Sequence, residues 1–199
     1  MAALLVVGVV AGCTTTEAGE ATSRTNSQST TGNEPTQDTS SPSSVEIPPP
    51  PRDLSLVDLD PCTVLTDPQR AQLQISNVRS RVGDTKIYKD MKECTLDADT
   101  AEPFRTYTVI AVTNVDVSFW LNERRNADAK LISIAGYPAA EFHTKGVENS
   151  DCAVAVGVAK NQHLHVEMDP LSGDLKQDQI CQASEQAAEM AMQTLQTLR

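Results

Sequence analysis

The 199-residue sequence lacks the short motifs that accompany most familiar catalytic sites. It contains no G-x-S-x-G for a serine nucleophile, no glycine-rich phosphate loop, no G-x-G-x-x-G for a dinucleotide and no H-E-x-x-H for zinc. These absences predict a protein that is not an enzyme and that needs no cofactor.

The sequence is also poor in positive charge, with 16 Lys and Arg against 27 Asp and Glu and a net charge of -11. Five acids and two bases between Cys13 and Arg52 contribute -3, so the residues after Arg52 still carry -8. Such an acidic surface repels phosphate backbones and anionic lipid headgroups. We therefore expect no nucleic-acid partner and no electrostatic binding to membranes.

No apolar run approaches the roughly 20 residues that a spanning helix needs. The short run Leu4 to Val10 ends in Ala11, Gly12 and Cys13, the pattern of a lipobox. It predicts a signal peptide over residues 1–12 and a lipid such as palmitate on Cys13, which would hold the protein outside the cell membrane. Signal peptides begin with basic residues and Met1 to Ala3 have none, so we expect the natural start upstream. The alternative is a buried strand followed by a core cysteine.

Residues 13–52 are rich in Thr, Ser, Glu and Pro and have few large apolar side chains. A segment of this composition cannot offset its conformational entropy, so we expect a disordered tether, stiffened as polyproline II over Ile47 to Pro51. O-glycosylation of the tether is an open alternative. Residues 53–199 are expected to form a single domain.

Within that domain the patterns predict an α+β fold, mainly an antiparallel sheet packed against two or three helices. Alternation predicts strands over residues 79–82, 91–96, 104–113, 131–134, 139–143, 151–159 and 164–168. Capping residues and helical spacing predict helices over residues 67–74, 114–127 and 177–198. The helix over 114–127 would place the only tryptophan, Trp120, against the sheet. The small side chains Ala153, Ala155 and Gly157 would let a helix approach one face of their strand closely.

Four cysteines follow Cys13, and four cysteines allow three pairings. We expect Cys62–Cys94 and Cys152–Cys181, because each bond closes a loop of about 30 residues between a helix and a strand that should be neighbours. A zinc site is disfavoured, since the cysteines lack C-x-x-C spacing.

His163 and His165 are the best, though weak, candidates for a metal site. They lie two residues apart on one strand and point to the same side, where His143 or Glu167 could join them. The simpler interpretation is a solvent-facing or helix-covered pair. His143 with Glu141 or Glu167 is the arrangement that an unfamiliar enzyme would use.

Several features occur in the same order as in a known family: the lipobox, the polar tail, the segment Leu59 to Thr66 around Cys62, the cysteine at 94, Gly136 with Pro138, and Cys152 with Cys181. In these features the sequence resembles the actinobacterial lipoproteins grouped as domain of unknown function 3558. Leu96 departs from this pattern, since the family often has an aromatic residue there. The resemblance implies a cell-envelope location and supplies no activity, so no functional residue can be transferred.

Three classes of function remain. We favour a monomeric envelope lipoprotein, anchored through Cys13, whose domain binds a small or lipidic ligand or a partner protein. A structural or interaction module without a pocket is the second class, and an unfamiliar envelope enzyme is the third.

Overall fold

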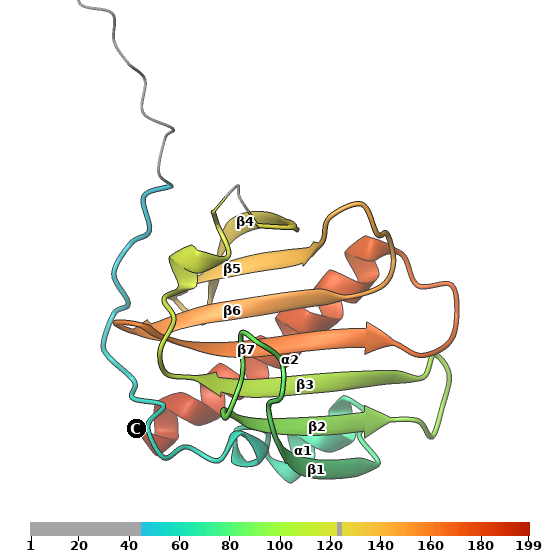
Figure 1. Cartoon of the computed structure of the whole chain (residues 1–199). Helices are drawn as coiled ribbons and strands as arrows, with labels where there is room; N and C mark the ends of the chain where they lie inside the picture. Colours follow the sequence, from blue (N-terminus) through green and yellow to red (C-terminus); the bar gives the residue numbers. More distant parts are fainter. Residues whose placement is uncertain (1–44, 123–124) are drawn as a thin grey trace, which may run out of the picture. The chain divides into compact units, whose positions relative to one another are not determined.

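An antiparallel sheet of seven strands organises residues 45–122 and 125–199, the part of the chain that this computed structural model describes (Figure 1). The strand order is β1-β2-β3-β7-β6-β5-β4, so the chain builds one edge, crosses to the other and returns to pair β7 with β3. The strands are β1 (Asn77–Val82), β2 (Lys92–Ala98), β3 (Arg105–Val112), β4 (Ala127–Ile134), β5 (Tyr137–Thr144), β6 (Cys152–Ala159) and β7 (Gln162–Pro170). The predicted signal peptide, Cys13 and the tether up to residue 44 lie outside the described residues.

One long helix, α2 (Gln177–Leu198), packs on the sheet, over the residues predicted for it. Ala187, Ala188 and Ala191 are fully buried, and their small side chains let α2 approach β6 and β7 closely. The expectation of two or three packed helices is therefore corrected. The second helix, α1 (Asp67–Gln72), has six residues, and η1 (Pro61–Thr63) and η2 (Val117–Phe119) are single 3-10 turns.

The helix predicted over residues 114–127 is wrong. Asp116 Oδ1 accepts a hydrogen bond from Ser118 N (3.0 Å) and begins η2, but the turn ends at Phe119 and β4 starts at Ala127. Asn, Asp, Ser and β-branched residues in this segment are weak helix formers. Their low helix propensity allows packing on the sheet to determine the conformation of the segment. Trp120 does lie against the sheet, as predicted, and stacks on Phe142 with ring centroids 4.0 Å apart.

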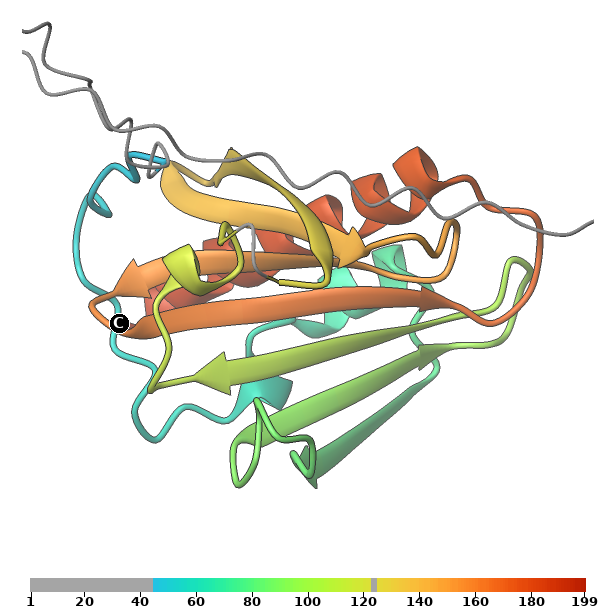
Figure 2. The same ribbon diagram turned by 45° about the horizontal axis from the view of Figure 1, so that its top comes forward.

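The two faces of the sheet are covered differently (Figures 1 and 2). Helices α1 and α2 lie on one face, and η2 with the connection from β1 to β2 lies on the other. The prediction that a helix approaches the small-residue face of β6 is wrong. Helix α2 packs on the opposite face, against Val154 and Val156. The small-residue face instead receives η2. A Cβ added at Gly157 would lie only 3.0 Å from Val117 Cγ1.

Both predicted disulfides are present. Cys62–Cys94 joins η1 to β2, and Cys152–Cys181 joins β6 to α2, across sequence separations of 32 and 29 residues. Closing loops of this length reduces the entropy of the unfolded chain, and each bond contributes about 3 to 4 kcal/mol on that account. The disulfides thus fix η1 to β2 and α2 to β6.

The last residues of the expected tether contact the domain. Ile47 packs against the aromatic cluster around Trp120, and the Arg52 guanidinium donates to the backbone carbonyls of Gln196 (2.6 Å) and Arg199 (2.9 Å). Figure 1 shows the carboxyl end of α2 beside this segment. None of the helices in residues 45–122 and 125–199 is long and apolar enough to cross a membrane.

Candidate functional site

A polar groove of about 530 Å³ opens where β4 and β5 meet the first turns of α2. We call it the α2 groove. Its lining combines acids, one lysine, one histidine, two amides and a disulfide sulfur: Lys130, Glu141, His143, Gln177, Asp178, Cys181, Gln182 and Glu185. An open site lined in this way suits a hydrogen-bonding ligand better than an apolar one.

Glu141 is the buried charge of the α2 groove. Its position on β5 turns its side chain toward α2, where that side chain is only 8% exposed. Lys130 is directly opposite on β4, and its Nζ lies 2.9 Å from Glu141 Oε1. The second oxygen, Oε2, is buried and has no hydrogen-bond partner among the residues that the structure describes. A buried ionised oxygen in this state is costly, so it needs a donor.

Glu185 can supply that donor when it is protonated. A hydrogen bond to Glu141, burial and the negative charge of Glu141 raise the pKa of the Glu185 carboxyl to about 7. The hydrogen bond to Glu141 also raises the pKa of Lys130, which keeps its charge. The groove therefore changes its charge near neutral pH.

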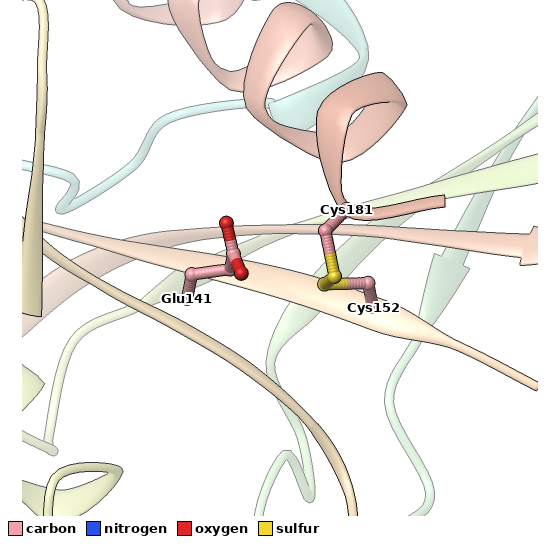
Figure 3. Close-up of side chains that lie close together, drawn as sticks. All are labelled: Glu141, Cys152 and Cys181. Carbon is pink, nitrogen blue, oxygen red and sulfur yellow. A yellow bond between two sulfur atoms is a disulfide. The ribbon is translucent and has the colours of Figure 1, made fainter. Parts of the chain in front are cut away.

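The Cys152–Cys181 disulfide lies beside Glu141 on the side of the sheet that faces α2 (Figure 3). Within residues 45–122 and 125–199, Glu141 with these two cysteines is the one group of potential metal ligands whose atoms all lie within 4.8 Å of one another. The sulfurs are bonded to each other and are not thiolates, the form that binds zinc. The disulfide here holds α2 against β6 and closes one wall of the groove.

His163 and His165 lie on the other face of the sheet, and both are buried, with exposed fractions of 0% and 1%. His163 Nδ1 donates to the backbone carbonyl of Val115 (2.9 Å), and Trp120 Nε1 donates to His163 Nε2 (3.4 Å). All the lone pairs and protons of this ring are thus used by the protein. Burial and the neighbouring His165 lower the pKa of His163 to about 4, so the ring is neutral at pH 7.

His165 bridges two further side chains. Its Nδ1 lies 3.1 Å from the Tyr88 hydroxyl and its Nε2 lies 3.1 Å from Glu167 Oε2. The expected pairing of the two histidines on one side of β7 is therefore correct, but neither ring has a free nitrogen. A metal ion bound by these residues would have to displace existing hydrogen bonds.

The structure separates the other predicted residues. Glu141 and His143 line the α2 groove together, whereas Glu167 lies on the opposite face of the sheet with His163 and His165. The expectation that His143 could join the two histidines at a metal ion is therefore wrong. Sequence reasoning missed Lys130 and Glu185. Glu185 could have been found from its position one helical turn after Cys181, because the predicted disulfide places this part of the helix over the sheet.

A second groove, of about 320 Å³, lies between the proline segment and the edge of the small-residue face. It is lined by Ile47, Pro48, Pro49, Pro50, Asp53, Asp116, Val117, Pro138, Gly157, Ala159 and Lys160. Its charged side chains Asp53, Asp116 and Lys160 all reach solvent. It therefore has no buried polar group that calls for a ligand.

A comparison with known protein families gives one match over most of the chain. Residues 8–194 match the family model described as "Protein of unknown function (DUF3558)". No curated protein and no solved structure matches the chain.

Proposed function

The chain belongs to the family described as Protein of unknown function (DUF3558), and from that premise we propose that it is a cell-envelope lipoprotein whose extracytoplasmic domain binds a small polar ligand in the α2 groove. The anchor in this proposal is a lipid on Cys13, after removal of residues 1–12 as a signal peptide. The membrane is then a partner through the lipid alone.

The observation that carries the ligand proposal is the buried Glu141 carboxylate with its unpaired Oε2. Buried carboxylate oxygens without a hydrogen-bond donor are rare, because each costs free energy of desolvation. A protonated Glu185 can supply a donor to Oε2, and a bound ligand can supply one when Glu185 is ionised. The amides of Gln177 and Gln182 add hydrogen-bonding groups that fix the orientation of a ligand.

A polar ligand agrees with the groove better than a lipidic one. Apart from the disulfide, every side chain in the lining is charged or hydrogen-bonding. The space between the sheet and α2 is filled by Val154, Val166, Met192 and their neighbours. A lipid chain would require an apolar gap there.

We propose binding without chemical conversion. One oxygen of Glu141 is held by Lys130, and the other has almost no accessible surface. A general base must come within hydrogen-bond reach of the proton that it removes. While Lys130 holds one oxygen and a protonated Glu185 donates to the carboxylate, Glu141 is poorly placed to remove a proton from a ligand.

The test is native mass spectrometry of the full chain extracted from its own envelope in mild detergent. We expect a small adduct on the wild-type protein and its loss in Glu141→Gln, which keeps the shape of the side chain and removes the charge. Glu102→Gln, in the exposed connection between β2 and β3, is the matched control and should keep the adduct. A wild-type protein that carries no adduct, or an adduct that Glu141→Gln retains, would contradict the proposal.

A further inference from the structure

We propose that Glu141 and Glu185 in the α2 groove together bind the ammonium group of a small organic amine, which takes the place of the hydrogen bond between the two carboxyls. This inference rests on the proposed function, since it assigns a chemical class to the ligand of the same groove. The exchange is balanced: one N–H donor replaces one O–H donor, and a proton leaves to solvent.

The groove already holds one ammonium group in the required geometry. Lys130 Nζ lies 2.9 Å from Glu141 Oε1, while the side chain of Lys130 remains 63% exposed. The same carboxylate has its second oxygen without a partner. An ammonium group has three donors and no acceptor, so it suits an oxygen that can only accept. The two oxygens of Glu141 can then be satisfied by the same chemistry.

The charge of the groove favours a cation once the shared proton has left. With Glu185 ionised, Glu141, Asp178 and Glu185 carry three negative charges against the one positive charge of Lys130. His143 also faces the groove, and Glu189 adds negative charge near Glu185. A bound ammonium would reduce this excess, whereas an anionic ligand would increase it.

A hard metal ion fits less well. Calcium takes six to eight oxygen ligands, and among the described residues the tight ligand cluster here consists of one carboxylate and two bonded sulfurs. An amine needs only a few acceptors. The carboxyl pair and the side-chain oxygens of Gln177 and Gln182 supply them.

The pH dependence of binding follows from the exchange. The pKa of Glu185 is about 7, so at lower pH the carboxyl is protonated and an amine must displace that proton. At higher pH the proton has already dissociated. One displaced proton makes the affinity rise about tenfold per pH unit below the pKa and level off above it. Between pH 5.5 and pH 8.5 we expect the Kd to fall about thirtyfold.

The experiment is a titration of the full chain with 1,5-diaminopentane by calorimetry, with NMR amide shifts to locate the site. Both amino groups of this probe stay protonated to pH 8.5, as a lysine does. Tetramethylammonium, which has charge but no N–H donor, is the matched probe and should bind at least tenfold more weakly. Shifts should centre on Lys130, Glu141 and Gln182.

Two variants separate the steps. Glu185→Gln should bind the diamine more weakly at pH 8.5, because it removes one carboxylate acceptor, and should lose most of the pH dependence, since no carboxyl proton remains to be displaced. Glu141→Gln should lose binding. Trp120 fluorescence, which reports the far face of the sheet, checks that each variant is folded.

The outcomes are distinct for the two proposals. If a ligand from the envelope occupies the groove but the diamine does not bind at pH 8.5, the amine inference is wrong and the proposed function stands. If neither binds, both are wrong. Diamine binding that is equal at pH 5.5 and pH 8.5 would overturn the exchange of proton for ammonium.

Discussion

His163 is a residue whose protonation opposes folding. Its pKa is lowered from 6.5 to about 4, first by burial and then by His165, although the Val115 carbonyl and Asp116 act in the other direction. The unfolded chain therefore binds a proton before the folded chain does. As the pH falls from about 6.5 toward 4, the contribution of His163 to the free energy of unfolding should fall by about 3 kcal/mol.

The measurement is urea unfolding of wild-type protein and of His163→Gln at pH 7 and pH 4.5, followed by Trp120 fluorescence. We expect the stability difference between the two proteins to shrink on acidification. Asp169, whose pKa is raised to about 7 by burial, Glu167 and Asp151, changes stability in the opposite direction with pH. It is present in both proteins, so its effect cancels in the difference. A difference that is the same at both pH values would show that His163 titrates normally.

Two histidines also mark the limit of prediction at the residue scale. Their spacing on an alternating strand correctly places both rings on one face of β7. Their burial could not be predicted, because the cover comes from irregular segments around Tyr88 and Trp120. Nothing periodic in those segments indicates where they will lie. Both histidines are therefore buried and hydrogen-bonded to other residues, whereas the pattern suggested a solvent-facing or helix-covered pair.

At the scale of elements, the close contact between η2 and β6 depends on Gly157. An added Cβ would lie 3.0 Å from Val117 Cγ1 and 3.3 Å from the Pro138 carbonyl oxygen. Overpacking of this kind commonly costs about 1 to 3 kcal/mol, and alanine regains part of it because it is less flexible than glycine. We expect Gly157→Ala to lower the free energy of unfolding by about 1 kcal/mol, measured by urea unfolding.

A double-mutant cycle tests the cause of that loss. Val117→Ala removes Cγ1, so Gly157→Ala should cost less in the Val117→Ala background than in the wild type. Equal costs in the two backgrounds would mean that Val117 does not limit the space at Gly157.

The elements differ in how well their sequences predict them. Helix α2 carries a buried stripe of apolar and small residues that also includes Ser184 and Thr194, and its predicted bounds are those observed. The strands alternate, and the structure extends most of them by one or a few residues. Residues 114–127 show one helical repeat of apolar residues and begin with the weak helix formers Asn, Val, Asp and Ser, which is too little to decide between a helix and a turn. Tertiary packing of Trp120 settles that segment, and packing is not a local property.

For the molecule as a whole, part of the α2 groove could be deduced from the order of the residues alone. The predicted Cys152–Cys181 bond places the start of α2 over β6, and β5 is the next strand. This brings the helix near Glu141 and His143. The ion pair with Lys130 and the proton shared with Glu185 could not be deduced, because they depend on the β4 register and on side-chain burial.

Attachment to the membrane is a property of the whole chain, and our last prediction concerns it. The residues after Arg52 carry -8, which disfavours electrostatic binding of the domain to anionic lipids, so in the proposed function the attraction comes from a lipid on Cys13. Cys13→Ala should therefore move the protein from the membrane fraction to the soluble fraction and abolish labelling by a fatty-acid probe. Thr14→Ala, which keeps the cysteine, should remain membrane-bound, and high salt should not release it because the attraction is not electrostatic. If Cys13→Ala still sediments with membranes and still takes up the label, residues 10–13 are not a lipobox, and the alternative of a buried strand with a core cysteine gains support.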